Sequence, residues 1–371
     1  MSGLFEKTKI GGMTVSNRFI RSATWEGMAT DGGGCTPQLV ELMCGLAAGE
    51  VGLIITGHAF VRPEGQAATK QLGISNDAFI PGLRKMTEAV HEHGGKIVLQ
   101  LAHGGLLSSK KLTGLQPVGP SVVEEISRSQ RSSEMTVEDI HDLIDAYGKA
   151  ALRARTAGFD GVQVHAAHGY LLSQFLSPFF NRRRDSYGGD AKGRAKMLMD
   201  IVREIRNTAG EDFPLLVKMN SRDFIQGGLD LEGSLETAGD LQDAGVDAIE
   251  LSGGTLLSGE LSPSRRGIET VRDEAYFRDA AEAFKTKLRV PLILVGGIRS
   301  FEVAEELVSK GITDYISMSR PLIREPGLVR RWREGDRRRA ACVSDNRCFK
   351  PALVGAGVYC VTDRDDREKA A

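Results

Sequence analysis

The sequence predicts an α/β protein folded as a closed (β/α)8 TIM barrel, and three observations lead to that prediction. Short apolar runs recur along the 371 residues, each followed by a turn and then by an amphipathic segment. The runs are continuously apolar rather than alternating, which is typical of parallel strands that helices cover. There are eight such units, the number that closes a barrel of this kind.

The elements follow one another in a regular order. The helical pattern is clear in "FEVAEELVSKG", where apolar residues between Val303 and Val308 share one face before a glycine ends the segment. An N-terminal hairpin is expected before the first strand and a C-terminal extension after the last helix. The eight strands are expected at Phe19–Ser22, Gly52–Thr56, Lys96–Leu101, Gly161–His165, Leu215–Asn220, Ala248–Ser252, Leu292–Gly296 and Tyr315–Ser319.

The alternative fold is an open, doubly wound parallel sheet. No G-x-G-x-x-G follows the first expected strand, so the phosphate fingerprint of a dinucleotide fold is missing. The polar segment from Gly104 to Glu134 contains Gly and Pro and is expected to form a loop over the barrel mouth. No linker separates two large domains, so the expected division is a barrel at 1–340 and a tail at 341–371.

Composition excludes several classes of partner. The 48 Lys and Arg residues balance 49 Asp and Glu residues, so the net charge of -1 gives no broad attraction to nucleic acid or membrane. The N-terminal "MSGLFEKTKI" has no signal-peptide core, and no apolar window is long enough to span a bilayer. The five cysteines form no disulfide pattern. These features predict a soluble, cytoplasmic protein.

The ends of the last two strands predict a phosphate site. Gly296 and Gly297 follow the seventh strand, and Ser319 and Arg320 follow the eighth. Glycine turns allow backbone N–H groups to approach an anion, and an arginine adds charge. Barrels of this type commonly bind phosphate at this place. The alternative interpretation is two tight turns and a structural arginine.

The segment after the fourth strand carries His165, His168 and Tyr170. Two histidines three apart can bind a metal, but no third ligand stands at a convincing place nearby. They can instead donate hydrogen bonds to a carbonyl oxygen that gains negative charge, while a protonated phenol supplies a proton. Lys218, on the fifth strand, is either an ordinary lysine or a desolvated amine for Schiff-base chemistry.

These residues lie in the stretch "HAAHGYLLSQFLSPFFNRRRDSYGG", which resembles the central signature of the Old Yellow Enzyme family of FMN-dependent NAD(P)H:flavin oxidoreductases and ene-reductases. The segments "LFEKTKIGGMTVSNRFIRSAT", "GLIITGHAFVRPEGQ", "IVLQLAHGG", "VGGIRS" and "ISMSRPLIREP" are similar to family blocks in the family's order. The resemblance covers nearly the whole chain. It implies a barrel with non-covalent FMN at its mouth and NADH or NADPH as the reductant.

The resemblance also implies roles for individual residues. Hydride would pass through flavin N5 to the β carbon of a carbonyl-activated alkene. His165 and His168 would hold the substrate oxygen, and Tyr170 would donate the proton. Lys218 would place a cation near flavin N1. The expected cofactor-binding residues are Ser22, Ala23, Thr24, Trp25, His58, Gln100, Lys218, Gly296, Gly297, Ser319 and Arg320.

Three features depart from the family pattern. Trp25 stands where many members carry Thr or Cys, and Lys218 replaces a usual arginine. The tail "ACVSDNRCFKPALVGAGVYCV" resembles the four-cysteine iron–sulfur motif of the 2,4-dienoyl-CoA reductase and trimethylamine dehydrogenase branch. Only Cys342, Cys348 and Cys360 remain, Asp345 stands at the second position, and the following spacing is one residue short. No iron–sulfur cluster and no metal site are therefore expected, and a zinc site formed by the three thiolates and Asp345 is the weaker alternative to free thiols.

Three functional hypotheses follow from the sequence. The first is an FMN-dependent ene-reductase or flavin oxidoreductase that acts on an enone or enoate, with oxidation of a small amine as the alternative direction. The second is a non-redox aldolase or isomerase that uses Lys218. The third is a barrel that only binds flavin. The sequence does not choose the substrate, the nicotinamide or a homo-oligomeric state, although the loops Gly104–Glu134 and Thr255–Val271 are expected to select the substrate.

Overall fold

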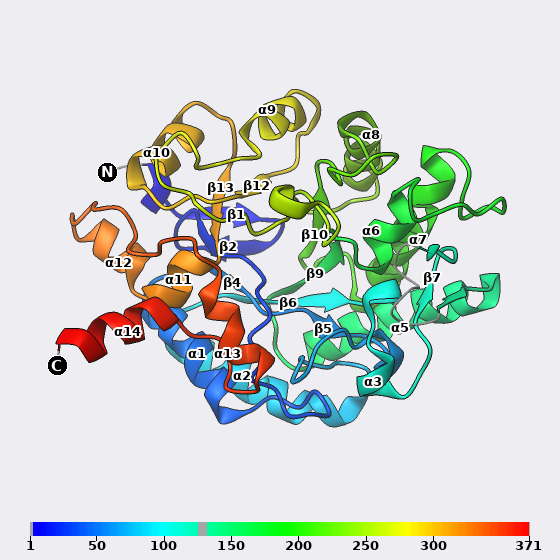
Figure 1. Cartoon of the computed structure of the whole chain (residues 1–371), viewed down its shortest axis with the longest axis horizontal. Helices are drawn as coiled ribbons and strands as arrows, with labels where there is room; N and C mark the ends of the chain where they lie inside the picture. Colours follow the sequence, from blue (N-terminus) through cyan, green and yellow to red (C-terminus); the bar gives the residue numbers. More distant parts are fainter. Residues whose placement is uncertain (1–2, 125–131, 371) are drawn as a thin grey trace.

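Eight parallel strands form a closed barrel in the computed structural model, which describes residues 3–124 and 132–370 (Figure 1). Pairing of the second barrel strand with the third closes the ring. The predicted barrel is confirmed, and the strand ends differ from the expected ones by at most one residue. The barrel strands are β3 (Phe19–Arg21), β4 (Leu53–Ile55), β6 (Ile97–Ala102), β9 (Gly161–Ala166), β10 (Leu215–Asn220), β11 (Ala248–Ser252), β12 (Leu292–Val295) and β13 (Tyr315–Met318).

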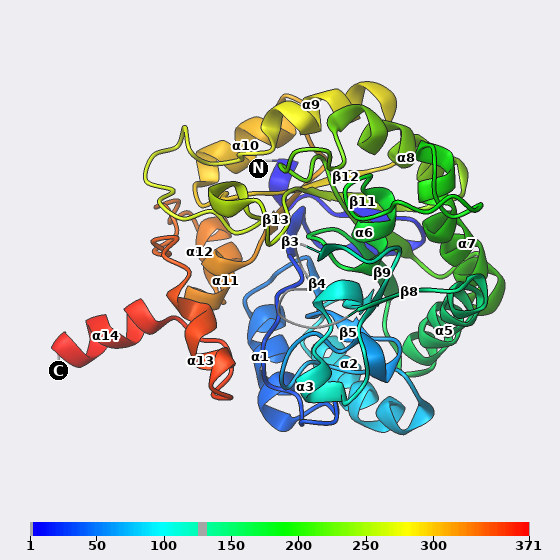
Figure 2. The same ribbon diagram turned by 45° about the vertical axis from the view of Figure 1, so that its right-hand side comes forward.

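Helices surround the barrel as an outer ring (Figure 2). Their buried faces pack on the outward side chains of the strands in one continuous apolar core. The longest, α5, begins at a capping box between Thr136 and Asp139, which satisfies free backbone N–H groups at the helix start. The ring consists of α1 (Pro37–Ala48), α2 (Ile80–Glu92), α5 (Val137–Thr156), α7 (Ala191–Ala209), α8 (Leu231–Asp243), α9 (Arg278–Lys287) and α10 (Phe301–Ser309), with α11 (Arg320–Arg324) and α12 (Leu328–Arg333) after the last strand.

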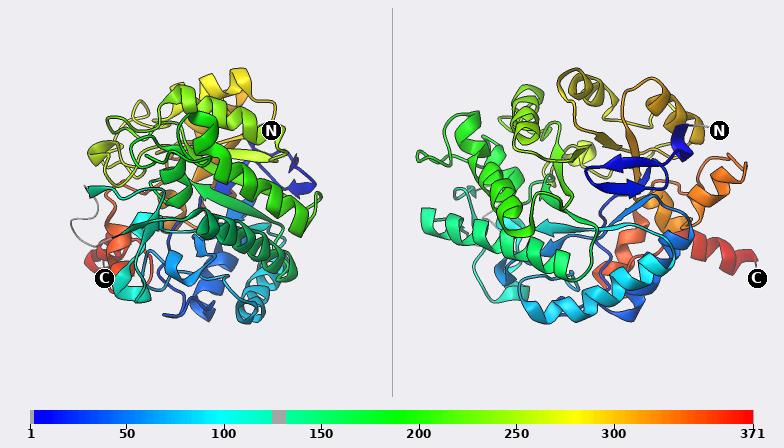
Figure 3. Two further views of the ribbon diagram at one scale, coloured as in Figure 1. Left: turned by 90° about the vertical axis from the view of Figure 1, so that its right-hand side faces the viewer. Right: turned by 180° about the vertical axis from the view of Figure 1, so that it is seen from behind.

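A hairpin of β1 (Thr8–Ile10) and β2 (Met13–Val15) closes the N-terminal end of the barrel, and it faces the viewer in the view from behind (Figure 3). Its apolar residues form a separate buried cluster with side chains of the barrel interior, among them Leu53 and Leu216. This end of the barrel is therefore filled with apolar side chains, and polar residues inside the barrel lie toward the other end, where the strands finish.

The excursion over the barrel mouth contains η4 (Gly105–Leu107), α3 (Lys110–Thr113), β7 (Val118–Gly119) and β8 (Ser133–Glu134). The central part of this predicted loop, at 125–131, lies outside the described residues. The tail carries η6 (Arg347–Phe349), α13 (Lys350–Leu353) and α14 (Val361–Ala370), and α14 projects from the barrel (Figure 2). Smaller elements are η1 (Gly3–Phe5), β5 (Ala59–Phe60), η2 (Pro63–Gly65), η3 (Asp77–Phe79), α6 (Leu171–Leu176) and η5 (Gly259–Leu261).

No helix within the described ranges is both long enough and apolar enough to cross a membrane.

Candidate active site

A cavity of about 380 Å³ opens where the barrel strands end. This size suits a small-molecule or cofactor site. All but one of the residues predicted for the site line it, and the exception, Gly296, lies outside the lining. The predicted residues in the lining are Ser22, Ala23, Thr24, Trp25, His58, Gln100, His165, His168, Tyr170, Lys218, Gly297, Ser319 and Arg320.

Three imidazoles and one phenol form a cluster in this cavity, in which His58 and His165 are buried and His168 and Tyr170 are half-buried. The ring of His165 lies 5.3 Å from that of His168 and 4.6 Å from that of Tyr170, centroid to centroid. His58 completes the group, because its Nε2 lies 3.3 Å from the Tyr170 hydroxyl. Burial lowers the pKa of His58 to about 4 and raises the pKa of Tyr170 to about 12. The cluster therefore offers a protonated phenol among neutral imidazoles.

The two signature histidines differ in their hydrogen bonding. Nε2 of His168 pairs with the Ser252 hydroxyl at 2.7 Å, whereas Nδ1 of His165 is buried and has no hydrogen-bond partner among the described residues. The pKa values of both imidazoles lie well below the usual value, first through burial and then through neighbouring cationic groups such as Lys218. An unsatisfied ring nitrogen in a cavity is a candidate contact for a ligand.

The backbone at His168 is in the left-handed region, with φ 64°. A non-glycine residue in this conformation costs about 1–3 kcal/mol and persists only where its surroundings hold it there. Its N–H donates to Oδ1 of Asn220 at 3.1 Å, and an isolated bridge joins it to Thr255. This conformation turns the chain between β9 and α6, so that His168 and Tyr170 both line the cavity that His165 enters from the strand.

A buried ion pair supports the floor of the cavity. Nζ of Lys218 lies 3.2 Å from Oε1 of Glu250 and donates to the Ser22 hydroxyl at 2.7 Å. The same Oε1 accepts from the hydroxyls of Ser22 at 2.7 Å and Ser317 at 2.8 Å. Glu250 is 0% exposed and stands behind the lining residues. Lys218 and Glu250 are neighbours in the β10–β11 register, so the barrel itself aligns the pair.

The ionised carboxylate also fixes the direction of two amides. Because it can only accept, Gln163 donates Nε2–H to Oε2 of Glu250 at 2.9 Å. The carbonyl of Gln163 then accepts from Nε2 of Gln100 at 2.7 Å. This order leaves the carbonyl oxygen of Gln100 for the cavity, where it can accept a hydrogen bond from a ligand.

The far end of the cavity is cationic. The guanidinium groups of Arg299 and Arg320 are 8% and 7% exposed, and neither forms an ion pair within the described part of the chain. Burial lowers the pKa of Arg299 from its ordinary value, and the nearby Arg339 adds to this. A Cβ atom at Gly297 would lie 2.8 Å from the Tyr276 ring, so only glycine fits that turn. Two buried cations that form no ion pair among the described residues, beside a glycine turn, suit a phosphate group.

A second buried ion pair positions the residues after β3. Nη2 of Arg21 lies 2.8 Å from Oε1 of Glu26, and the same oxygen accepts from the N–H of Gly57 at 2.8 Å. This contact holds the segment that contains Ser22 and Thr24 against the end of β4. Trp25 is half-buried, and its indole N–H donates to the carbonyl of Thr69 at 3.1 Å, so it packs this loop while it also lines the cavity.

The tail supplies residues that sequence analysis did not predict. Ser344, Asn346 and Phe349 line the cavity. Asn346, with φ 61°, accepts from Arg320 at 2.7 Å and donates to the carbonyl of Ser264 at 2.7 Å. It therefore joins the tail to the phosphate end of the cavity and to the loop after β11. The sequence singled out this segment for its resemblance to a cysteine motif, and gave no sign that the segment lines the cavity.

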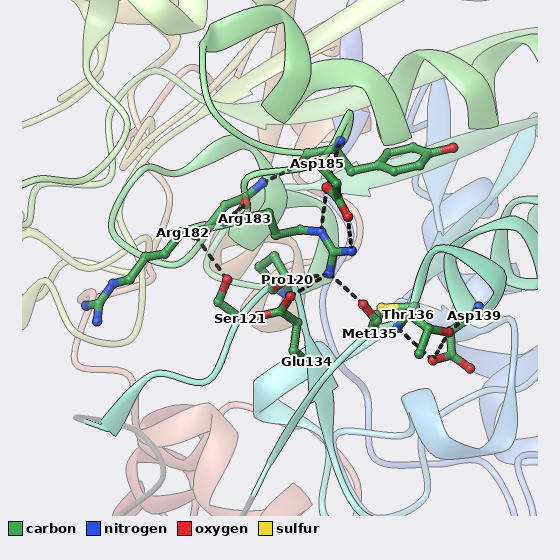
Figure 4. A network of polar contacts seen from close by, with 11 residues as sticks. Pro120, Ser121, Glu134, Met135, Thr136, Asp139, Arg182, Arg183 and Asp185 are labelled. Carbon is green, nitrogen blue, oxygen red and sulfur yellow. Dashed lines mark hydrogen bonds and ion pairs between the residues drawn. The ribbon is translucent and has the colours of Figure 1, made fainter.

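The arginine run of the signature has a structural role (Figure 4). Arg183 is buried and pairs with Asp185, and its Nη1 donates to the carbonyls of Pro120 at 3.1 Å and Met135 at 2.5 Å. Pro120 lies within the excursion over the mouth, and Met135 directly follows it. Arg183 thus anchors the excursion to the loop after α6.

The three tail cysteines are free thiols, and burial raises the pKa of Cys342 and Cys348. The Asp345 carboxylate already accepts two hydrogen bonds, from the Thr362 hydroxyl at 2.7 Å and from the N–H of Arg347 at 3.0 Å. Across residues 3–124 and 132–370, no group of three or more His, Cys, Asp or Glu residues is arranged to hold a metal ion.

A second cavity of about 770 Å³ adjoins the first and shares Ser262, Ser264, Tyr276 and Asn346 with it. The loop after β11 supplies most of its lining, which includes Arg265, Arg266 and Arg272. The Arg265 guanidinium lies 4.5 Å from the centre of the Tyr276 ring. Basic and acidic residues both occur in this lining, with the arginines in excess.

Comparison with known proteins adds independent information. The model of the NADH:flavin oxidoreductase / NADH oxidase family matches residues 3–338. NADH oxidase from Thermoanaerobacter brockii is 34% identical over 348 residues, which are 92% of this chain and 52% of that protein. The chain therefore spans about half the length of that curated relative.

Two solved structures show the same fold. A 2-naphthoyl-CoA reductase in complex with 2-naphthoyl-CoA gives a TM-score of 0.88 at 28% identity, covering 96% of this chain and 56% of that one. The old yellow enzyme homologue from Zymomonas mobilis gives a TM-score of 0.75 at 28% identity, covering 89% and 92%.

Proposed function

Because the chain belongs to the NADH:flavin oxidoreductase / NADH oxidase family, also called the Old Yellow Enzyme family, we propose that it reduces carbonyl-activated C=C bonds. FMN as the cofactor and NADH or NADPH as the reductant follow from that family. The observation that carries the finer proposal is the cluster of Tyr170 with three neutral imidazoles in the mouth cavity.

The residues present fit FMN. Arg299, Arg320 and Gly297 would hold its phosphate, because two buried cations there lack a carboxylate partner among the described residues. The carbonyl of Gln100 and the ammonium of Lys218 would meet polar atoms of the flavin ring. When bound, FMN supplies a two-electron carrier between the nicotinamide and the substrate.

The chain's own groups then supply orientation and a proton. His165 and His168 would donate hydrogen bonds to the carbonyl oxygen of the substrate, which gains negative charge as the alkene is reduced. Tyr170 holds its proton across the neutral range, since burial raises its pKa to about 12, and it would donate that proton to carbon. Nε2–H of His58 would then stabilise the phenolate that remains.

Two other hypotheses are weaker. An aldolase needs a free neutral amine, whereas Nζ of Lys218 is engaged by the Glu250 carboxylate and the Ser22 hydroxyl. Oxidation of an amine requires binding of a cation. No carboxylate lines the cavity within the described residues, and the lining contains Lys218, Arg299 and Arg320. The electrostatics therefore favour a neutral or anionic substrate.

We also propose that the substrate carries an anionic substituent, for which an unsaturated acyl-CoA thioester is the first candidate. The second cavity, with Arg265, Arg266 and Arg272, adjoins the first and would accept phosphate groups. The solved complex of a 2-naphthoyl-CoA reductase with 2-naphthoyl-CoA supports this candidate. In this arrangement residues 1–340 form the FMN-binding barrel, and the tail at 341–371 completes the cavity wall.

One anaerobic experiment tests the proposal. Acid precipitation of the purified protein should release one FMN per chain, and NADH or NADPH should bleach the flavin band under argon. Addition of cyclohexenone or crotonyl-CoA should then restore the band. Release of FAD, a protein that takes up no flavin, or a reduced flavin that neither acceptor reoxidises would refute it.

A further inference from the structure

The buried ion pair of Lys218 and Glu250 joins two barrel strands, and it also contacts residues that line the cavity. Lys218 lines the cavity, whereas Glu250 lies behind it and has no access to solvent. Oε1 of Glu250 lies within 3.2 Å of Nζ and accepts two hydroxyl groups, and Oε2 accepts one amide. Every contact of this carboxylate therefore goes to a residue that lines the cavity or, through Gln163, to Gln100.

These contacts keep Glu250 ionised inside the barrel. A buried carboxylate normally takes up a proton, but an ammonium group and three hydrogen-bond donors stabilise its charge. Together they hold the pKa of Glu250 below its ordinary value, although burial acts in the opposite direction. The pair then presents a cation to the cavity with its countercharge directly behind it.

The Glu250 carboxylate changes the electrostatic effect of the Lys218 ammonium group on a cofactor bound in the cavity. Reduction of a flavin adds negative charge to its ring, and a nearby cation favours the reduced form. A countercharge about 3 Å from that cation offsets most of the effect, because the two charges act on the flavin with opposite sign.

We propose that Glu250 is a positioning residue that lowers the reduction potential of the bound FMN by neutralising Lys218 and by fixing its ammonium group at the cavity floor. This inference rests on the proposed placement of FMN in the mouth cavity. Glu250 touches neither substrate nor cofactor in this assignment, and its influence passes through Lys218, Ser22 and the amides of Gln163 and Gln100.

The first measurement is the midpoint potential of the flavin in Glu250→Gln, obtained by slow anaerobic reduction with a reference dye. Loss of the countercharge should favour the reduced flavin about tenfold, which is roughly 30 mV in the positive direction for a two-electron couple. The matched control is Glu88→Gln, an exposed glutamate on the outer helix α2, which should leave the potential unchanged. An unchanged or lowered potential in Glu250→Gln would overturn the inference.

The double variant Lys218→Gln with Glu250→Gln separates charge from structure. It removes both charges, so the potential should return to within a twofold change of the wild-type equilibrium constant. A purely structural role of Glu250 would not produce this recovery, because both original side chains are gone. A double variant that kept the tenfold shift of Glu250→Gln would therefore refute charge compensation.

Folding of the variants is a separate matter, because Glu250→Gln leaves Lys218 as an unpaired buried charge. If that variant does not fold, the double variant still decides the question, since it leaves no unpaired charge. A tenfold shift of the double variant in the negative direction would then show that Lys218 acts as an uncompensated cation. A wild-type protein that bound no flavin would overturn the proposed function as well, whereas bound flavin with the wrong shifts would overturn only this inference.

Discussion

The hydroxyl oxygen of Tyr170 lies 3.3 Å from Nε2 of His58, and the two rings meet edge to face with centroids 5.1 Å apart. The pair joins the end of the second barrel strand to the start of α6. Burial shifts both groups away from the neutral range, with a pKa of about 12 for Tyr170 and about 4 for His58. The phenol is therefore protonated and the imidazole neutral under ordinary conditions.

Replacement of Tyr170 with Phe tests its role as proton donor. Reduction of the flavin by NADH or NADPH should stay nearly unchanged, because that half-reaction needs no phenol. Reduction of an alkene should slow by about 10² or more, which is typical for loss of a general acid. Stopped-flow traces of the two half-reactions measure both rates. Reduction of quinone acceptors should keep its wild-type rate. An equal loss of rate in both half-reactions would indicate a structural role of the hydroxyl group.

Replacement of His58 with Leu removes the hydrogen-bond partner of Tyr170. We expect alkene reduction to slow about tenfold, with His58→Gln less affected because an amide can still donate. In the wild type this rate should be flat from about pH 5.5 to 9, since neither group titrates there. A change in the rate that depends on His58 is expected only as the pH drops toward 4, where its imidazole takes up a proton. A titration near pH 6.5 in the rate profile would contradict this assignment.

Replacement of either His165 or His168 with Ala should weaken the binding of a phenol such as p-hydroxybenzaldehyde. Loss of one donor to an oxyanion costs about 3 kcal/mol, so the dissociation constant should rise about 10²-fold. Spectral titration of the flavin band measures it. The control Ser252→Ala, which removes only the partner of His168, should have a smaller effect. Stoichiometric zinc that disappears in both variants would instead show a metal site.

His103, buried outside the cavity, predicts a pH dependence of stability. Its pKa is lowered to about 3 by burial, with Arg62 adding to the shift. Between pH 6.5 and 3 the unfolded chain binds a proton that the folded chain does not, so the free energy of unfolding falls as the pH falls. Urea denaturation at pH 7.5, 6.0 and 5.0 measures the free energy of unfolding. Its slope against pH should be smaller in His103→Gln than in the wild type, by up to about 1.4 kcal/mol per pH unit.

The exposed His93→Gln is the control for that series and should keep the wild-type slope. Equal slopes in the wild type and His103→Gln would show that this imidazole does not contribute to acid sensitivity.

The tail should bind no iron–sulfur cluster. Three thiols are present where four thiolates are needed, and Asp345 is engaged by Thr362 and Arg347. Protein purified without oxygen should show flavin bands only, and an iron assay should read near zero even after incubation with iron and sulfide. Four irons per chain with an EPR signal in the reduced state would refute this prediction.

The sequence predicted the barrel well, because continuous apolar runs report parallel buried strands directly. Nearly all the residues that it predicted for the site line the cavity, since residues at the ends of barrel strands converge, but it missed other lining residues such as Tyr276 and Arg299. It did not reveal Glu250, although a charged residue within an apolar strand was a visible signal. Only the register of β10 and β11 shows that this charge faces Lys218.

Other contributions to the site depend on long-range contacts that no local pattern encodes. Asn346 reaches the cavity because the tail folds back over the last strands, and its pairing with Ser264 joins residues 82 positions apart. Arg299 was closer to prediction, since it lies in the quoted "VGGIRS" two residues after Gly297. The shape of the tail, unlike that of the strands, follows from tertiary packing alone.

The fixed direction of the two amides in the barrel limits how this protein can evolve. Gln100, Gln163 and Glu250 come from three separate strands, yet each determines which end of the next side chain must donate. With a neutral residue at position 250, Gln163 would no longer have to donate its amide N–H to that position. A carboxylate at position 163 would lie beside the negative charge of Glu250. Substitutions at these positions should be epistatic, so that among homologues the three residues are expected to change together or not at all.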